Sequence, residues 1–267
     1  MSKTFALPAE VSALTHKYLE AVDSALPGFV ELLYVTGSAA LGAWQPPHSD
    51  IDTVIVTSRE ITTKDFAVLA RIHEGMPKSP KLDGVYLDRR AFDARVADRR
   101  AVPFVVDGQF RTDKPCGELT PILWLLLRRY GQAVRGPAVD ALGLVDDPEA
   151  VRRYNLENLR SFWQPLAEDV RTHVRELAED APADPEMMAW MMLGPARLHY
   201  TLETGSIVSK AGAATYVCER FPEWAGLAQK AASWREGATV AFVSADAIAA
   251  AASIDVIAEN AWKNYGA

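Results

Sequence analysis

Two aspartates lie two residues apart at the start of an apolar run. Asp50 and Asp52 flank Ile51, and the Val and Ile residues of segment 51–56 predict a strand. Side chains two apart on a strand share a face, roughly 6–7 Å from each other. Two carboxylates so placed can hold Mg²⁺, which binds few carboxylates and completes its shell with phosphate oxygens and water. The pair therefore predicts a site for metal-assisted phosphate chemistry.

A Gly37-Ser38 pair follows another apolar run, residues 29–36. It falls where a strand would give way to a short helix over 38–44, so backbone N–H groups there can take a phosphate. Asp-x-Asp alone is commonly a solvated strand edge, and Gly-Ser is commonly just a turn. Both motifs in order, joined by a Pro46-Pro47 turn, form a much rarer pattern. It favours a metal-dependent nucleotidyl transfer site.

The stretch from Tyr34 to Val56 resembles the nucleotidyltransferase superfamily with its Gly-Ser and Asp-x-Asp signature. Within it, the stretch is similar to the spectinomycin/streptomycin adenylyltransferase branch of aminoglycoside nucleotidyltransferases. A weaker resemblance runs from Leu14 to about Trp224. It implies transfer of AMP from MgATP to a hydroxyl, with release of pyrophosphate. The resemblance also implies that Ser49, the residue before the first aspartate, is a phosphate ligand, so Gly37, Ser38 and Ser49 are expected to hold ATP.

A third carboxylate is needed to bridge a metal or to take the proton of the attacking hydroxyl. The branch supplies this residue from a later strand, and the matching segment here is 82–87, which makes Asp83 the candidate base or shared Mg²⁺ ligand. The family usually carries Glu at this place, and Asp is one methylene shorter. Asp88 is the rival candidate, although an ion pair with Arg89 or Arg90 is the simpler interpretation of that residue.

The second half of the chain offers a phosphate-binding pair. Residues 205–210 are typical of a helix end, a turn and a new helix with Ser209 as N-cap, so Lys210 would stand at a helix N-terminus suited to anions. Arg197 precedes it by 13 residues. In the family branch an Arg and a Lys at this interval contact ATP, so the resemblance implies that role for Arg197 and Lys210. A lone Lys after a turn would otherwise be a solvated surface residue.

The acceptor is less well defined. Relatives that modify streptomycin carry a Trp and two acidic residues before the Arg helix, and the aligned positions here are at or near Ala178, Ala183 and Met187. The resemblance therefore favours a spectinomycin-type acceptor over streptomycin. Trp163 and Trp190, with Asp180, Asp184 and Glu186, could line a cleft for a cationic sugar. Trp163 and Trp190 could equally be core residues of a helical bundle.

Composition and charge restrict the class of protein. The chain has 267 residues, 49% hydrophobic and 24% charged, with a net charge of −7. An acidic protein repels nucleic acid and attracts a polycationic small molecule, so we expect an aminoglycoside or aminocyclitol partner and no nucleic acid. Two cysteines form neither a disulfide framework nor a zinc pattern. We expect a monomeric cytoplasmic protein without a signal or membrane segment.

The pattern of elements predicts an α+β fold with two domains. Residues 1–148 are expected to form a nucleotidyltransferase domain, a mixed β-sheet flanked by helices, and residues 149–267 a C-terminal α-helical bundle, with the active site between them. The turn at Asp146-Asp147-Pro148 sets the boundary. Expected helices are 14–25, 62–76, 119–130, 149–179, 185–204, 210–220, 224–235 and 245–262, and expected strands are 29–36, 51–57 and 84–87.

Two other function classes remain open at this point. One is a protein-modifying nucleotidyltransferase that adenylylates a partner in the manner of an antitoxin, but that branch is usually a short single domain. The other is a catalytically weak homologue that binds nucleotide or drug without turnover. The intact Gly-Ser and Asp-x-Asp motifs argue against a binding protein, whereas Asp83 in place of the usual Glu leaves it possible.

Overall fold

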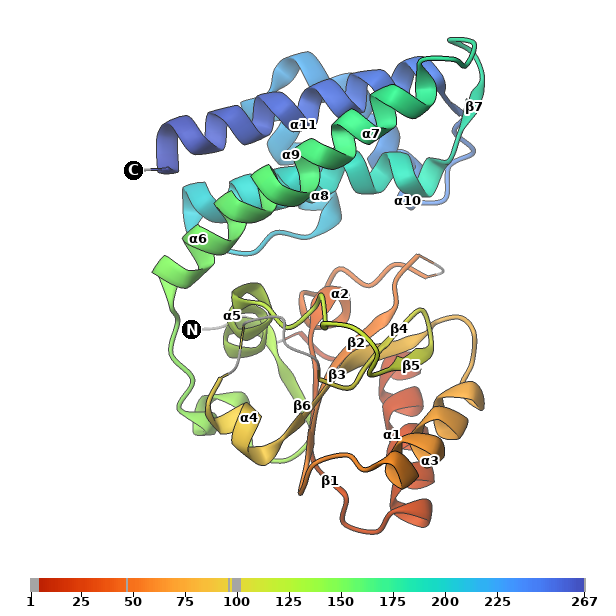
Figure 1. Cartoon of the computed structure of the whole chain (residues 1–267), viewed down its shortest axis with the longest axis vertical. Coiled ribbons are helices and arrows are strands. Elements are labelled where there is room, and N and C mark those ends of the chain that lie inside the picture. The colour runs from red at the N-terminus through yellow and green to blue at the C-terminus, as the bar shows by residue number, and fades with distance from the viewer. Residues whose placement is uncertain (1–4, 47, 96, 98–101, 267) are drawn as a thin grey trace. The chain divides into compact units, whose positions relative to one another are not determined.

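The chain forms two compact units, Met1–Asp147 and Pro148–Ala267 (Figure 1). The structure is a computed structural model that describes residues 5–46, 48–95, 97 and 102–266. Pro47, half of the expected Pro-Pro turn, lies outside the described residues. The division at Asp147 coincides with the turn that precedes a helix beginning at Pro148, as Pro at a first helical position favours.

The first unit is built on a six-stranded mixed sheet in the order β5-β4-β3-β2-β1-β6. Only β2 and β3 run parallel, and the other neighbouring pairs are antiparallel. The expected mixed sheet is thereby confirmed. The strands are β1 Val30–Val35, β2 Ile51–Thr57, β3 Leu82–Asp88, β4 Phe104–Val106, β5 Gln109–Arg111 and β6 Gln132–Arg135.

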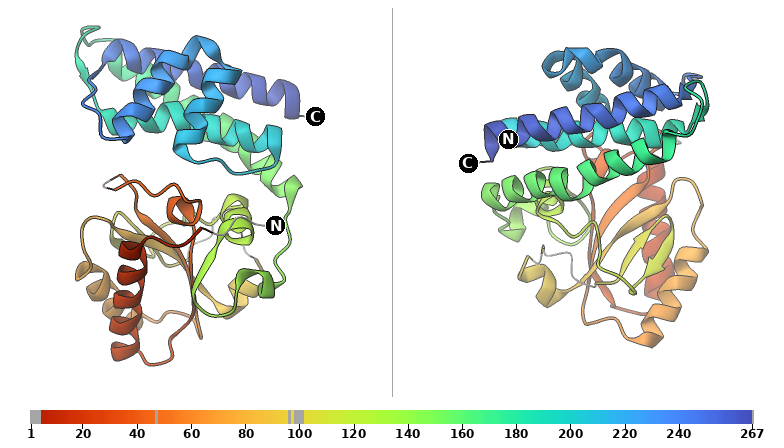
Figure 2. Two further views of the ribbon diagram at one scale, coloured as in Figure 1. Left: turned by 180° about the vertical axis from the view of Figure 1, so that it is seen from behind. Right: turned by 45° about the horizontal axis from the view of Figure 1, so that its top comes forward.

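Helices cover both faces of this sheet, as the views in Figure 2 show. On one face α1 (Ala9–Ala25) and α3 (Thr63–Glu74) pack over the odd-numbered residues of β2, such as Ile51 and Ile55. On the other face α4 (Arg89–Asp93) and α5 (Pro121–Tyr130) pack over Val54, Val56, Val85 and Leu87. Because β2 is buried on both faces, its run of Val and Ile residues is nearly continuous.

The start expected for helix 62–76 is confirmed, because Thr62 is the N-cap of α3. Its hydroxyl accepts a hydrogen bond from the Asp65 N–H, and the Asp65 carboxylate accepts one from the Thr62 N–H, which together form a capping box. Arg59 adds a charged partner, and this guanidinium holds the pKa of the Asp65 carboxyl well below its usual range. The cap fixes the exit of the chain from β2.

Three short strands of the first unit are not among those that the sequence predicts. Residues 104–111 form the β4–β5 hairpin, which extends the sheet next to β3. Residues 132–135, which follow directly on α5, form edge strand β6, where Arg135 pairs with Leu33. Arg135 also binds Asp23 of α1 through two hydrogen bonds. A strand of three or four residues is too short to show a periodic pattern.

The second unit is a helical bundle, as expected. Its core combines small Ala side chains of the last helix with Met188, Met191 and Met192. Its elements are α6 Pro148–Asn158, a π-helical turn Leu159–Trp163, α7 Gln164–Val174, α8 Pro185–Thr204, α9 Lys210–Arg220, a 3₁₀ turn Pro222–Trp224, α10 Ala225–Arg235 and α11 Ser244–Tyr265.

The single helix expected over 149–179 is divided by the π-helical turn. Pro165 lacks the N–H that would bond to the carbonyl of Ser161, and the Gln164 N–H instead reaches back to the Leu159 carbonyl. The break expected at 180–185 contains β7 (Pro182–Ala183), which pairs with β8 (Phe242–Val243). Among the described residues, no helix has the length and apolarity needed to cross a membrane.

Candidate active site

Asp50, Asp52 and Asp83 lie on one face of the sheet at the start of β2 and β3. Asp52 is the direct partner of Asp83 across the parallel pair, and partners on adjacent strands project to the same face with backbones about 4.8 Å apart. Asp50 precedes Asp52 by two residues and shares that face. Asp52 is exposed, whereas Asp50 and Asp83 are half-buried. The structure thus brings the three predicted carboxylates together at one end of two central strands. We call this group of Asp50, Asp52 and Asp83 the acidic edge.

Gly37 lies directly against the Asp52 carboxylate. A β-carbon at residue 37 would stand 1.8 Å from Oδ2 of Asp52, and Gly37 has a φ of +60°. The backbone next to it is fixed because the Thr36 N–H donates to the Asp52 carbonyl at 2.8 Å. Only glycine satisfies both the left-handed conformation and this close approach.

Ser38 follows in the short helix α2 (Gly37–Ala40). The first N–H groups of a helix have no partner within it, so those at 37–39 face outward from its start. The Ser38 side chain is half-buried. Gly37 and Ser38 therefore present backbone donors next to Asp52, as expected for a phosphate site.

Ser49 has a structural contact that the sequence did not indicate. Its side chain is 4% exposed, and its hydroxyl oxygen accepts a hydrogen bond from the Gln45 N–H at 3.0 Å. This bond closes the loop between α2 and β2 immediately before Asp50. Ser49 therefore shapes the approach to the aspartates, and its expected contact with phosphate stays a prediction.

Asp83 is held by the β4–β5 hairpin. Its Oδ2 accepts the Asp107 N–H at 2.8 Å, and its Oδ1 accepts the Gly108 N–H at 3.0 Å. Burial raises the pKa of the Asp83 carboxyl; these two N–H donors oppose the rise, whereas the charges of Asp50 and Asp107 add to it. A raised pKa makes a carboxylate a better proton acceptor near neutral pH.

Lys81, which is not among the site residues predicted from the sequence, also faces the acidic edge. Its backbone N–H donates to Asp50 Oδ1 at 3.3 Å, and its Nζ lies 2.7 Å from Asp107 Oδ1. The hydrogen bond with Asp107 raises the pKa of Lys81, and the charges of Asp50 and Asp83 act in the same direction. A Lys two residues before the candidate base was the available sequence signal, since the two share a strand face.

Asp88, the rival base, lies at the opposite end of β3. It pairs with Thr57 at the end of β2, five residues along the strand from the Asp52–Asp83 pair. Its carboxylate caps α4 by accepting the Ala91 N–H at 2.8 Å, while Arg89 binds Asp93. The structure therefore gives Asp88 a capping role in place of the ion pair that we expected from the sequence.

The donor set at the acidic edge fits Mg²⁺ held by two carboxylates. Within the described ranges, no three His, Cys, Asp or Glu side chains are grouped to hold a metal ion. Asp83 turns both oxygens to N–H groups of the hairpin, and Asp50 and Asp52 are the other two carboxylates of this face. Mg²⁺ normally takes one or two protein carboxylates and fills its other positions with water and substrate phosphate. The residues present suit that arrangement.

The helix–turn–helix expected around Lys210 is confirmed within the second unit. Gly205 ends α8 in a left-handed conformation, and the Ser209 hydroxyl caps α9 by accepting the Gly212 N–H. Lys210 is the first residue of α9. Arg197 reaches from α8 to this segment, where its Nε donates to the Val208 carbonyl at 3.0 Å. Arg197 therefore supports the turn that carries Lys210.

The residues considered for a cationic sugar take different places. Trp163 is 5% exposed and packs on Gly194, where a β-carbon would come within 2.4 Å of its ring. Its ring centroid lies 4.6 Å from that of half-buried Trp190. Asp184 caps α8 by accepting the Glu186 N–H at 2.8 Å. The structure thus supports the core interpretation for Trp163.

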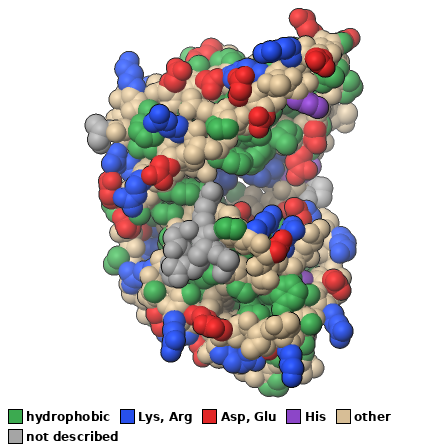
Figure 3. Space-filling model, viewed as in Figure 1, with side chains coloured by type: hydrophobic (Ala, Val, Ile, Leu, Met, Phe, Trp, Pro, Cys, Tyr) green, Lys and Arg blue, Asp and Glu red, His purple; other side chains and the backbone are tan. Residues whose placement is uncertain are grey.

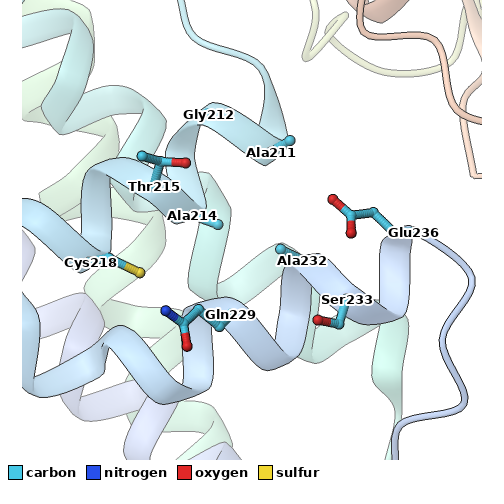
Figure 4. Close-up of a pocket in the computed structure, with 9 residues that line it drawn as sticks. All are labelled: Ala211, Gly212, Ala214, Thr215, Cys218, Gln229, Ala232, Ser233 and Glu236. Carbon is cyan, nitrogen blue, oxygen red and sulfur yellow. The ribbon is translucent and has the colours of Figure 1, made fainter.

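A groove of about 480 Å³ lies between α9 and α10 (Figure 4). Its lining side chains are mostly small or uncharged, and Glu236 is the carboxylate among them. A triphosphate needs donors and positive charge, which these lining residues do not provide. The groove therefore does not suit ATP. Its polar and sulfur-bearing lining residues are Thr215, Cys218, Gln229, Ser233 and Glu236.

Charges of both signs are interspersed on the surface of each unit, on the face drawn in Figure 3. Proteins that bind nucleic acid commonly gather Lys and Arg into a patch or stripe along one element. The mixture on this face differs from that pattern.

Two family models match the chain. A model described as a nucleotidyltransferase domain matches residues 16–92, which include β1, β2, β3 and the acidic edge. The first unit therefore contains a nucleotidyltransferase domain.

The second model, described as the C-terminal domain of aminoglycoside adenylyltransferase, matches residues 160–259 of the helical unit. With both matches, the chain belongs to the nucleotidyltransferase superfamily, in its aminoglycoside adenylyltransferase branch.

A solved structure has the same fold over most of the chain. The spectinomycin adenyltransferase AAD(9) from Enterococcus faecialis, crystallised with ATP and spectinomycin, matches with a TM-score of 0.69 and 14% sequence identity. The match covers 92% of this chain and 98% of that one. No curated protein sequence matches the chain significantly.

Proposed function

We propose that this protein transfers AMP from MgATP to a hydroxyl of an aminoglycoside or aminocyclitol antibiotic, with a spectinomycin-type acceptor favoured over streptomycin. The observation that carries the proposal is the placement of Asp50, Asp52 and Asp83 on one sheet face, with Gly37 directly against Asp52. It occurs in a chain whose helical unit matches the C-terminal domain of aminoglycoside adenylyltransferases.

The phosphate side of the reaction would use Gly37, Ser38 and Ser49. The outward N–H groups at the start of α2 would donate to phosphate oxygens, and Ser49 would keep the following loop closed through Gln45. Asp50 and Asp52 would hold Mg²⁺. When bound, the metal neutralises charge on the phosphates and on the leaving pyrophosphate.

Asp83 would act as the base. Its carboxylate takes the proton of the acceptor hydroxyl as the hydroxyl oxygen forms a bond to the α-phosphorus of ATP. The bond between the α-phosphorus and the bridging oxygen breaks, and pyrophosphate leaves. The raised pKa of the Asp83 carboxyl and its fixed orientation by Asp107 and Gly108 support this role.

The helical unit would add Arg197 and Lys210 to the ATP site. Lys210 would supply a point charge for the triphosphate from the start of α9. Arg197, which already holds the preceding turn through Val208, would contribute more weakly. We further propose that the protein is cytoplasmic and monomeric. Light scattering would test the monomeric state.

The acceptor preference rests on residues just before α8 and in its first turn. The positions that carry a Trp and two acids in streptomycin-modifying relatives are at or near Ala178, Ala183 and Met187 in this chain. None of these side chains can bind a guanidinium group as a carboxylate does. The net charge of −7 would still favour the approach of a cation.

Pyrophosphate release tests the proposal. The purified protein is given Mg²⁺, each of the four nucleoside triphosphates and a panel that includes spectinomycin and streptomycin. We expect release with ATP and spectinomycin, little with streptomycin and none with Asp52→Asn. Transfer of AMP to a protein in the absence of antibiotic would contradict the proposed reaction. So would the absence of pyrophosphate release with every acceptor.

A further inference from the structure

The turn between β4 and β5 has an unusual backbone for two consecutive residues. Asp107 and Gly108 have φ values of 54° and 67°, and Val106 pairs with Gln109 on either side of them. Two left-handed residues in a two-residue hairpin loop are typical of a type I′ turn, for which Asp-Gly is a preferred sequence. Such a turn points its two central N–H groups in fixed directions.

Both of these N–H groups point to the same carboxylate. The Asp107 N–H donates to Asp83 Oδ2 at 2.8 Å and the Gly108 N–H donates to Asp83 Oδ1 at 3.0 Å. Each oxygen thus has one donor, so the plane of the carboxylate is fixed. Each oxygen also keeps a further lone pair to accept a proton.

The turn is itself attached on two sides. Phe110, two residues after Gly108, packs its ring 4.9 Å from Phe66 and 5.1 Å from Tyr86, measured between ring centroids. Lys81 Nζ lies 2.7 Å from the Asp107 carboxylate. The aromatic contacts fix the hairpin to the core, and Lys81 connects its tip to the strand that carries Asp83.

We propose that the β4–β5 turn is a positioning element for Asp83: Asp107 and Gly108 orient its carboxylate for proton transfer, and Lys81 steadies the turn. The inference rests on the proposed function, because Asp83 is the base only if transfer occurs. The competing interpretation is that Asp83 merely satisfies the donors of a structural turn. The two interpretations differ in what a displaced turn does to catalysis.

Amide hydrogen exchange tests the contact without any need for activity. At the tip of a hairpin the Asp107 and Gly108 amides would exchange freely unless Asp83 accepts them. In Asp83→Ala both amides should exchange about tenfold faster, as expected for loss of one hydrogen bond each. The Arg111 amide, which faces Phe104 across the hairpin in a hydrogen-bonded pair, reports whether the hairpin persists. Unchanged exchange at Asp107 and Gly108 would overturn the proposal.

A displaced turn tests the positioning role. Insertion of one glycine between Asp107 and Gly108 lengthens the loop and moves both donors away from Asp83. We expect kcat to fall at least tenfold while the KM for ATP and the melting temperature stay close to wild type. The matched control is a glycine inserted beside Gly28, which has a φ of +70° and where a β-carbon would meet nothing within 4 Å. That loop precedes Val30, which pairs with Thr57 at the far end of β2.

The outcomes distinguish the positioning role of the β4–β5 turn from the proposed transfer reaction. A wild-type kcat in the 107–108 insertion, with the amide protection lost, would overturn the positioning role and leave the proposed reaction standing. A wild-type protein without transfer to any acceptor would overturn the proposed function. In that case the exchange measurement still decides whether the turn holds the Asp83 carboxylate.

Discussion

Gly37 leaves room for the Asp52 carboxylate and for no side chain of its own. A β-carbon at residue 37 would lie 1.8 Å from Oδ2, 2.7 Å from Cγ and 3.0 Å from Cβ of Asp52. Rotation of the carboxylate alone cannot relieve a contact that includes Cβ. The glycine of the Gly-Ser motif and the second aspartate of the Asp-x-Asp motif are therefore two parts of one contact.

Gly37→Ala is expected to remove activity out of proportion to its effect on stability. The left-handed φ of +60° costs an alanine about 1–2 kcal/mol, and the clash displaces a proposed Mg²⁺ ligand as well. Turnover measured as pyrophosphate release should fall at least tenfold. Gly28→Ala is the matched control, because its φ of +70° imposes a similar strain with no contact within 4 Å. Equal losses of activity in the two variants would contradict the interpretation.

Asp50→Asn and Asp52→Asn should each abolish turnover while the fold persists. Both carboxylates are proposed to hold the Mg²⁺ that neutralises developing charge, and an amide binds Mg²⁺ far more weakly. Circular dichroism should match wild type, and Asp93→Asn, which changes a carboxylate in an exposed pair with Arg89, should retain full rate. More than about a tenth of wild-type activity in either site variant would contradict the assignment of Asp50 and Asp52 as Mg²⁺ ligands.

The long elements of this fold could be predicted from the sequence, whereas the short ones could not. Strand 51–57 and helices 185–204 and 210–220 have the predicted bounds, because each is long enough to show its period or carries a Pro, Gly or Ser boundary signal. Edge strand β6 is only four residues and follows directly on a helix. Its pairing partner Leu33 is about a hundred residues away, and no local pattern encodes that contact.

In the candidate site, residues close in sequence could be predicted, whereas contacts made only by the fold could not. Asp50, Asp52 and Gly37 are close in sequence, so their motif spacing was informative. Asp107 and Gly108 reach Asp83 only through the hairpin, although the Asp-Gly pair is a strong hairpin signal that could have been used. The family pattern predicts a phosphate contact for Ser49, whereas its hydrogen bond with Gln45 depends on how the intervening loop folds.

Asp83→Asn should remove transfer without weakening ATP binding. An amide cannot take the proton of the acceptor, and general-base catalysis contributes a factor of roughly 10²–10⁴. Asp88→Asn, at the other end of β3, should keep its rate and lose at most about 1 kcal/mol of stability from a weaker helix cap. Rapid-quench rates and calorimetric ATP affinities would separate the two. A wild-type rate in Asp83→Asn would move the role elsewhere.

His73 is expected to make the first unit less stable in weak acid. It is 4% exposed beneath the sheet, its Nε2 lies 2.8 Å from the Tyr86 hydroxyl, and burial lowers its pKa from 6.5 to about 4. The unfolded chain therefore binds more protons than the folded one between pH 6.5 and 4. Stability is fully present above pH 6.5 and falls as the pH drops through this window, by roughly 2 kcal/mol at pH 5.

Urea unfolding at pH 7.5 and pH 5 checks this expectation. Wild type should lose more stability between the two values than His73→Phe, which keeps an aromatic ring next to Phe110 but cannot take a proton. The difference between the two proteins isolates His73 from the carboxylates, which titrate in both. The same loss in both proteins would show that His73 does not cause the pH dependence.

Lys210→Ala should weaken MgATP binding by roughly 1–3 kcal/mol if a charge-assisted contact with the triphosphate is lost. Arg197→Ala should have a milder effect, partly through the turn that it holds at Val208. Lys263→Ala, which changes an exposed lysine near the end of α11, serves as the charge-matched control.

If ATP orders the site, the acceptor should bind more tightly after a non-hydrolysable ATP analogue than before it, because the two affinities are then coupled. Calorimetry measures each of these quantities. Equal acceptor affinity with and without the analogue would remove the coupling, and unchanged ATP affinity in Lys210→Ala would return this lysine to the solvated surface.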